Sequence, residues 1–212
     1  MYLSSFRVGN CPDRLVELAK GGRRAAVVAN AMDAAPPQVR REAVTRELDA
    51  LTALRFVAEE LDLRDYFGTS GAVVSELRRF DTVWLRGGNV FMLRYALARS
   101  GADGDLTRLL DEDAIVYSGY SAGPCVLAPT LRGLEAVDGA SVVEEVYGDQ
   151  PIWEGLGVLD YSIVPHVASP EHPESAALGL VAEQYRRFGI PHKTLRDGEV
   201  LIIDGTTEFV CR

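Results

Sequence analysis

The sequence predicts an α/β fold: a three-layer α/β/α sandwich on a mostly parallel, doubly wound sheet, with a C-terminal β-hairpin at the sheet's edge. Two observations lead to this class. Short apolar, β-branched runs alternate with longer segments of helical spacing, which is typical of a parallel sheet covered on both faces. The chain then ends in two strand-like runs around Asp204-Gly205, a strong hairpin signal. Its 212 residues fit a single domain over residues 1–212.

The first elements are a strand and a helix. Ala25–Ala29 is a short apolar run that predicts a strand, and Gln38–Ala53, after two prolines, has apolar residues at helical spacing. Periodicity alone assigns Arg55–Leu63 to neither helix nor strand.

Two further strands each run into a glycine-containing turn and then a helix. Thr82–Leu85 precedes Gly87-Gly88-Asn89, and a helical pattern follows over Val90–Ala98. Ile115–Tyr117 leads through Gly119 into a helical pattern over Ala122–Leu127. Because ligand sites in such folds collect where parallel strands end, both turns are candidate positions for chemistry.

The last third of the chain is less regular. Residues 133–155 are rich in Gly, Asp and Glu without clear periodicity, which predicts a long loop. Ser162–Pro165 is a short apolar run that predicts a strand. Glu199–Ile203 and Thr206–Cys211 predict the two strands of the hairpin.

Charge argues against nucleic acid and membrane partners. The chain has 22 basic and 31 acidic residues, a net charge of −9, and residues 107–212 hold 7 basic against 17 acidic groups. Phosphate backbones and anionic membranes need clustered Lys and Arg, which that half lacks. Met1–Asn10 has no apolar segment of a signal peptide. We therefore expect a cytoplasmic protein, a monomer or a homodimer.

Cysteine and histidine spacing predicts neither a disulfide framework nor a metal site. Cys11, Cys125 and Cys211 are too few and too scattered. Cys125 follows Ser121 by one helical turn and is expected to be a small buried hydrophobe. The histidines and acids of residues 166–174 lack the H-E-x-x-H spacing of a zinc site. Since no Walker A or dinucleotide motif occurs either, no cofactor is predicted.

Gly119-Tyr120-Ser121-Ala122-Gly123 is the most informative motif. A G-x-S-x-G pattern between a strand and a helix describes a nucleophile elbow, in which glycines permit a tight turn and the serine Oγ is exposed. The alternative is an ordinary glycine-containing turn with an incidental serine. The context of strand and helix favours Ser121 as a nucleophile.

A serine nucleophile needs a base, and the chain offers three histidines. His166 directly follows the predicted strand Ser162–Pro165 and is the favoured base. His172 is a second candidate, and His192 follows Pro191 in a polar turn. A noncatalytic role is the alternative for each.

The acid that would orient the imidazole is not decided by the sequence. Asp197 lies in the turn before the hairpin, Glu199 follows two residues later, and Asp160 precedes the strand of His166. All three remain candidates.

The oxyanion of a serine reaction needs backbone N–H donors. Ala122 would supply one, and Gly88 of Gly87-Gly88-Asn89 a second, with Gly87, Asn89 and Tyr120 as candidates for substrate binding. Asn89 is also suited to be the N-cap of the following helix.

Three segments together resemble the peptidase E (aspartyl dipeptidase) family of serine peptidases. They are Leu85–Phe91 with Gly-Gly-Asn, Tyr117–Gly123 with the serine elbow, and Val164-Pro165-His166, in the family's order and at similar spacing. The resemblance covers most of the chain and implies a fold like that of class I glutamine amidotransferases, with serine in place of cysteine. It implies the chain order Ser, His, acid.

By position, the resemblance implies Ser121 as nucleophile, His166 as general base and Asp197 as the acid, which is glutamate in some relatives; Glu199 aligns almost as well. Relatives that prefer an N-terminal aspartate are expected to present a basic group after the catalytic histidine, but Val167–Tyr185 has neither Lys nor Arg. Only Arg86 or Arg132 could supply that charge. Strict aspartyl specificity is therefore not expected.

The resulting prediction is a serine peptidase that hydrolyses dipeptides or short peptides with free N-termini through an acyl-enzyme, without cofactor or metal. One alternative is a serine esterase or amidase on a non-peptide substrate. Others are a catalytically silent protein that binds a small molecule or peptide, and an amidotransferase-like protein that uses Cys125.

Overall fold

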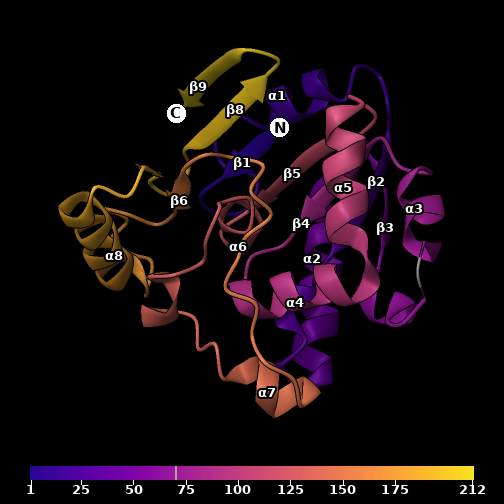
Figure 1. Ribbon diagram of the computed structural model, residues 1–212. Coiled ribbons are helices and arrows are strands. Elements are labelled where there is room, and N and C mark those ends of the chain that lie inside the picture. Colours follow the sequence, from indigo (N-terminus) through magenta and orange to yellow (C-terminus); the bar gives the residue numbers. More distant parts are fainter. Residues whose placement is uncertain (70) are drawn as a thin grey trace.

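The computed structural model describes residues 1–69 and 71–212. Its centre is a seven-stranded sheet in the order β3-β2-β4-β5-β1-β8-β9 (Figure 1). The first five strands in this order are mutually parallel, and β8 and β9 add an antiparallel hairpin at the edge. The strands are β1 (Tyr2–Ser4), β2 (Arg24–Val28), β3 (Val57–Glu60), β4 (Thr82–Leu85), β5 (Val116–Tyr120), β8 (Val200–Asp204) and β9 (Thr207–Cys211).

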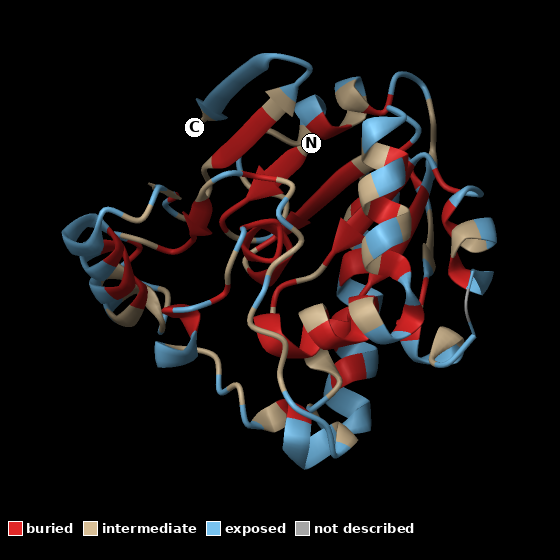
Figure 2. Cartoon of the chain, in the orientation of Figure 1, coloured by how far each residue is buried: buried red, intermediate tan, exposed pale blue. Residues whose placement is uncertain are grey.

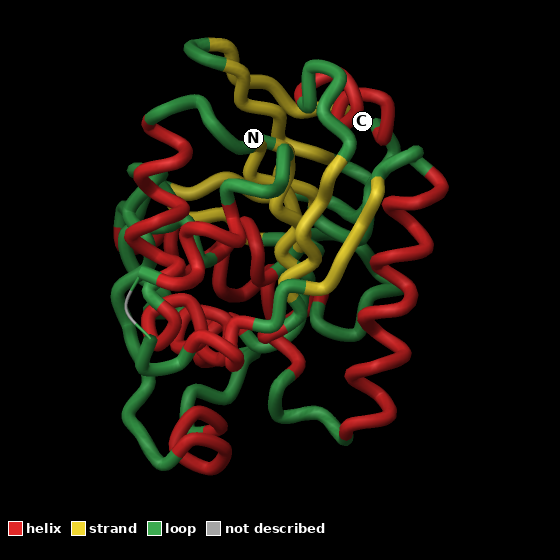
Figure 3. Tube along the Cα trace, turned by 90° about the vertical axis from the view of Figure 1, so that its right-hand side faces the viewer, coloured by secondary structure: helices red, strands yellow, loops and turns green. Residues whose placement is uncertain are grey.

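Helices cover both faces of the sheet, so the predicted α/β/α layering is confirmed (Figure 3). Leu15 of α1 (Pro12–Leu18) and Leu51 of α2 (Pro37–Ala53) pack with Trp84 on one face. The other face carries α3 (Ala72–Leu77), α4 (Val90–Ser100), α5 (Ala102–Asp111) and α6 (Ala122–Cys125). Helix α8 (Ser175–Phe188) instead packs against the strands β6 (Ser162–Val164) and β7 (His192–Thr194). Figure 2 shows the buried strands between these layers. Of the described helices, none is long and apolar enough to cross a membrane.

The local predictions agree with the elements observed. The apolar run Ala25–Ala29 forms β2, and the helical pattern from Gln38 forms α2. Arg55–Leu63, which periodicity left open, contains edge strand β3 and reaches the first residue of the short 3₁₀ helix η2 (Leu63–Tyr66). Because β3 lies at the edge, its Val57 is exposed, which explains the weak apolar pattern.

Residues 133–155 are more ordered than the predicted long loop. They contain a 3₁₀ helix, η3 (Leu134–Ala136), and α7 (Val142–Tyr147). The Tyr147 hydroxyl donates to Asp33 Oδ2 (2.7 Å), beside η1 (Asn30–Met32), and the Tyr147 ring stacks on Tyr95. Contacts to distant residues, which local periodicity does not encode, hold these short helices.

The strand that precedes His166 lies outside the main sheet. β6 (Ser162–Val164) pairs in parallel with β7 (His192–Thr194) in a separate two-stranded sheet. An apolar run predicts a strand but not its partner, so the sequence did not reveal this second sheet.

The expectation that the cysteines form no disulfide is wrong for one pair. Cys11 is bonded to Cys211, across 200 residues, and Cys125 is free and buried. Hairpin β8–β9 pairs with β1, which brings the end of the chain beside the residues that follow β1. Sequence spacing could not show this proximity because the sheet creates it.

Candidate active site

Ser121 occupies a strained turn between β5 and α6. Its φ of 53° and ψ of −108° lie where residues with a Cβ are uncommon, a strain that proteins concentrate at functional sites. The neighbouring glycines allow β4 to approach the turn. A Cβ on Gly119 would collide with the Leu85 carbonyl oxygen, and one on Gly123 would lie 2.6 Å from it. The G-x-S-x-G spacing therefore has a steric cause.

Gly87-Gly88-Asn89 lies directly beside this turn, at the end of β4. A Cβ on Gly87 would lie 2.9 Å from the Cβ of Ser121, and one on Gly88, whose φ is +143°, would lie 2.7 Å from the Ala31 carbonyl oxygen. Asn89 is the N-cap of α4: its Oδ1 accepts from the N–H groups of Phe91 (2.9 Å) and Met92 (3.0 Å). The substrate-binding role predicted for Gly87 and Asn89 remains untested.

Two backbone N–H groups are available at this junction. In residues 1–69 and 71–212, the N–H groups of Gly88 and Ala122 have no hydrogen-bond acceptor. Both belong to the turns that the sequence proposed for an oxyanion. Free donors of this kind could stabilise a negative oxygen formed at Ser121.

His166 and Asp197 form a short contact in which the imidazole is buried and the carboxylate partly exposed. His166 Nδ1 lies 2.6 Å from Asp197 Oδ1, and the His166 side chain is 1% exposed. With Nδ1 directed to the carboxylate, Nε2 is the nitrogen left to exchange a proton. Burial lowers the pKa of His166 from its ordinary value of 6.5, whereas Asp197 opposes that effect. A neutral imidazole near pH 7 is suited to accept a proton.

Ser4 and Ser5, at the end of β1, connect the serine turn to this pair. The Ser121 N–H donates to the Ser4 carbonyl oxygen (3.3 Å), and the His166 N–H donates to Ser5 Oγ (2.9 Å). Ser5 Oγ in turn donates to Asp197 Oδ1 (2.9 Å). Sequence reasoning missed Ser5, because its partners lie 161 and 192 residues away and no local pattern marks it.

Of the three acids considered, Asp197 alone is hydrogen-bonded to His166 within the part of the chain described. The Asp197 N–H donates to Ser169 Oγ (2.8 Å), which holds its loop. Glu199 turns elsewhere: its Oε2 accepts from the Arg196 N–H (3.0 Å), and its Oε1 pairs with Arg212 (3.1 Å).

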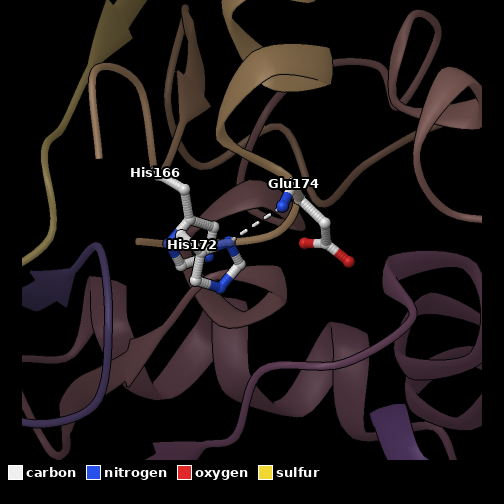
Figure 4. Close-up of side chains that lie close together, drawn as sticks. All are labelled: His166, His172 and Glu174. Atoms are coloured by element: carbon white, nitrogen blue, oxygen red, sulfur yellow. Dashed lines mark hydrogen bonds between the residues drawn. The ribbon is translucent and has the colours of Figure 1, made fainter. Parts of the chain in front are cut away.

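His172, the second histidine candidate, stacks on His166. The ring centroids are 3.6 Å apart and the planes are parallel within 1° (Figure 4). His172 Nδ1 accepts from the Glu174 N–H (3.3 Å), and the Phe6 ring meets both imidazoles edge-on. These ring contacts fix the orientation of the His166 imidazole.

The cluster of His166, His172 and Glu174 does not fit a shared metal ion. Potential ligand atoms of the three lie within 4.8 Å of one another. An imidazole binds a metal through a nitrogen lone pair in the plane of its ring. Two parallel planes separated by a stacking distance cannot both contain one ion.

Ser121 lines a small cavity of about 20 Å³. Asp138 and Glu174 line it too, together with Ala122, Cys125, Leu134, Val137, Pro165 and Leu178. An open groove of about 990 Å³ lies nearby, with His172, Asp197 and Arg196 in its lining. The cavity and the groove present different charges, since the lining of the cavity has carboxylates but no Lys or Arg.

Tyr120 and Cys125 are used inside the fold. Tyr120 is buried, and its hydroxyl donates to Glu47 Oε1 (2.9 Å). Its proposed contact with substrate therefore has no support in the geometry. Cys125 is buried as expected, its Sγ lies 3.3 Å from the Ile163 carbonyl oxygen, and burial raises the pKa of its thiol, which disfavours the reactive thiolate.

The basic residues considered for an aspartyl substrate point elsewhere. Arg86 Nε lies 3.3 Å from Glu47 Oε1, and the Arg132 guanidinium lies over the Trp153 ring. Arg196, which sequence reasoning did not consider, donates to the Ala168 carbonyl oxygen through Nε and Nη2 (3.3 Å each) at the groove.

Comparison with known proteins places these features in a sequence family. The model of peptidase family S51 matches residues 11–210. An uncharacterized peptidase of Listeria monocytogenes serovar 1/2a is 30% identical over 119 residues, which cover 55% of this chain and 54% of that protein. Peptidase E of Streptomyces coelicolor is 32% identical over 140 residues, 64% of this chain and 54% of that protein. The matches thus span about half the length of these relatives.

Solved structures show the same fold. A crystal structure of a protein from Listeria monocytogenes EGD-e, provisionally assigned as peptidase E, superposes with a TM-score of 0.80 at 22% identity, covering 100% of this chain and 96% of that chain. A peptidase from an acI-B1 Actinobacterium gives a TM-score of 0.61 at 14% identity, covering 99% and 92%.

Proposed function

Because the chain belongs to peptidase family S51, we propose that it is a serine peptidase that hydrolyses dipeptides or short peptides with free N-termini. The observation that carries this proposal is the 2.6 Å contact of His166 with Asp197. Ser5 Oγ accepts from the His166 N–H, and the carbonyl oxygen of the preceding residue, Ser4, accepts from the Ser121 N–H. Peptidase E of Streptomyces coelicolor, a relative, supports the peptide substrate class.

In the proposed reaction Ser121 Oγ attacks the scissile carbonyl carbon while His166 Nε2 takes the hydroxyl proton. Asp197 holds the imidazole tautomer and stabilises its charged form. The oxyanion accepts hydrogen bonds from the N–H groups of Gly88 and Ala122. His166 then protonates the leaving amine, and water hydrolyses the acyl-enzyme through the same base.

Hydrolysis of X-Leu dipeptides by the wild type and Ser121→Ala tests this proposal. With X = Asp, Glu, Ala, Leu and Lys, we expect turnover by the wild type and a loss of at least about a thousandfold in kcat for the variant. Since Arg86 pairs with Glu47 and Arg132 lies over Trp153, Asp-Leu should be cleaved no faster than Ala-Leu or Leu-Leu.

Other outcomes would contradict parts of the proposal. Activity retained by Ser121→Ala would exclude the nucleophile, and a strong preference for Asp-Leu would exclude the relaxed specificity. A folded wild type that cleaves no peptide but hydrolyses an ester or amide would indicate the non-peptide hydrolase. Binding without turnover of any substrate would indicate the silent binder.

A further inference from the structure

Arg86 is a largely buried cation directly before the glycine turn at the end of β4. Its side chain is 14% exposed, and its Nε lies 3.3 Å from Oε1 of Glu47, whose side chain is 7% exposed. Its Nη1 donates a hydrogen bond to the carbonyl oxygen of Gly87. Because a buried cation is costly to separate from its carboxylate, this pairing keeps the guanidinium in place at the Gly87 carbonyl group.

Glu47, on α2, is itself fixed by hydrogen bonds at both of its oxygens. Trp84 Nε1 donates to Oε2 (2.9 Å), and the hydroxyl of Tyr120 donates to Oε1 (2.9 Å). The guanidinium carbon of Arg86 also lies 6.0 Å from the centre of the Tyr120 ring. Since Tyr120 immediately precedes Ser121, the pair of Arg86 and Glu47 joins the glycine turn to the serine turn.

The backbone at both ends of the glycine turn is hydrogen-bonded to the segment that begins with β2. The Arg86 N–H donates to the Val28 carbonyl oxygen (3.0 Å), and the Asn89 N–H donates to the Ala31 carbonyl oxygen (3.0 Å). The peptide unit of Gly87-Gly88 lies between these two anchors. Because neither of its residues has a Cβ, sterics restrict its rotation little. The hydrogen bond from the Arg86 side chain is therefore a specific restraint on its orientation.

The orientation of this peptide unit decides which group it presents at the serine turn. The peptide bond is trans, so the Gly87 carbonyl oxygen and the Gly88 N–H point in opposite directions. With the carbonyl oxygen bound to Arg86, the Gly88 N–H is directed away from the guanidinium, and in the described part of the chain it has no acceptor. A reversed peptide unit would present a carbonyl oxygen in its place and would repel an oxyanion.

We propose that Arg86 is a positioning residue of the oxyanion site: it holds the Gly87-Gly88 peptide unit so that the Gly88 N–H stays available to the oxyanion. The inference rests on the proposed function, since that oxyanion forms when Ser121 attacks a carbonyl carbon. Arg86 acts through Gly88 and does not touch the substrate. Glu47 supports it by holding the guanidinium.

Steady-state cleavage of Ala-Leu by Arg86→Gln is the first test. We expect kcat to fall at least about tenfold while KM stays within about twofold, because the hydrogen bond to the oxyanion is made fully only in the transition state.

Arg94→Gln is the matched control. Arg94 is 11% exposed and, like Arg86, pairs with one carboxylate, Asp103 (3.0 Å), and one backbone carbonyl group, that of Glu154 (2.8 Å). Thermal unfolding should show that both variants lose stability, whereas kcat of Arg94→Gln should stay within about twofold of the wild type.

A pair of ligands tests the oxyanion site without turnover. With 1-aminoethylboronic acid, the Ser121 oxygen adds to boron and its proton passes to His166, which gives a tetrahedral adduct with an oxygen at the oxyanion position. Alaninamide has a trigonal carbonyl group and forms no adduct. Calorimetry of Arg86→Gln should show at least about tenfold weaker binding of the boronic acid and a change within about twofold for alaninamide.

Glu47→Gln gives a second variant in case Arg86→Gln does not fold. It keeps the size of the side chain and removes the charge that holds the guanidinium. It should lower kcat and boronic acid binding in the same direction, with KM and alaninamide binding unchanged.

The outcomes separate this inference from the proposed function. An active wild type whose Arg86→Gln variant keeps its kcat and its boronic acid binding would overturn the positioning role and leave the peptidase intact. Equal losses for the boronic acid and alaninamide would also overturn it, since they would show general damage to the site. A wild type that cleaves no peptide but binds the boronic acid in an Arg86-dependent way would support the positioning role and contradict the peptidase. Neither cleavage nor boronic acid binding by the wild type would contradict both.

Discussion

Asp138 has an unusual ionisation for a carboxyl group beside a proposed nucleophile. Burial, with a smaller contribution from Glu174, raises its pKa from 3.8 to about 7, although the hydrogen bond from the Val90 N–H opposes the shift. Near neutral pH this carboxyl group is therefore only partly ionised.

The pH dependence of kcat/KM follows from the pKa of His166. Cleavage of Ala-Leu needs a neutral imidazole to accept the proton of Ser121. Burial holds the pKa of His166 below 6.5, so kcat/KM should be constant near neutral pH and fall only below that value. A fall that begins well above pH 6.5 would contradict His166 as the base.

The carboxyl group of Asp138 should reduce the stability of the fold. Because its folded pKa is above its unfolded value of 3.8, the native state loses stability as pH rises from about 4 to 7. Asn can still accept from the Val90 N–H but carries no charge. Asp138→Asn should therefore melt at a higher temperature than the wild type at pH 8, and the difference should vanish near pH 4. A lower melting temperature at pH 8 would show that the carboxylate is balanced by charges within the protein.

At the scale of elements, α7 is held in place by a contact to a residue 114 positions earlier in the sequence. The Tyr147 hydroxyl bonds to Asp33, and Asp33 also pairs with Arg40 (3.0 Å) on α2. The Tyr147 ring stacks on Tyr95 with centroids 4.8 Å apart. These contacts anchor the segment that carries Asp138, so residues 133–155 form a wall of the site.

Substitutions at Tyr147 separate the hydrogen bond from the stack. Tyr147→Phe keeps the ring and should lower the free energy of unfolding by about 1 kcal/mol, since one hydrogen bond is lost. Tyr147→Ala also removes the stack and should cost at least about 1 kcal/mol more. Urea unfolding measures both. Equal losses in the two variants would mean that the ring contributes nothing.

The serine elbow shows which elements local sequence can predict. Glycine is needed at positions 119 and 123 because the backbone of Leu85 lies too close for a Cβ atom. Asn89 caps α4, as its position before an apolar helical segment predicted. By contrast, the two-stranded sheet of β6 and β7 and the helices within residues 133–155 depend on packing partners far along the chain.

For the whole molecule, the disulfide between Cys11 and Cys211 links the start of α1 to the end of the edge strand β9. It closes a loop of about 200 residues, and cross-linking so long a loop restricts the unfolded chain. A reductant should therefore lower the free energy of unfolding by about 2–5 kcal/mol. Thermal unfolding with and without reductant measures this. The double variant Cys11→Ser/Cys211→Ser is the control, and it should not respond to reductant.

A wild-type melting temperature that does not change on full reduction would contradict this contribution. A matching response in the double variant would show that the effect does not come from the bond between Cys11 and Cys211.

The sequence by itself determined the alternation of strands and helices, the terminal hairpin, and the turns that carry Ser121 and Gly88. These are local features, set by apolar periodicity and by glycines within a few residues. Only the tertiary structure decided that Asp197 rather than Glu199 contacts His166, that Ser5 joins them, and that Cys11 meets Cys211. Each of these contacts joins residues more than 30 positions apart, and their proximity exists only once the sheet has assembled.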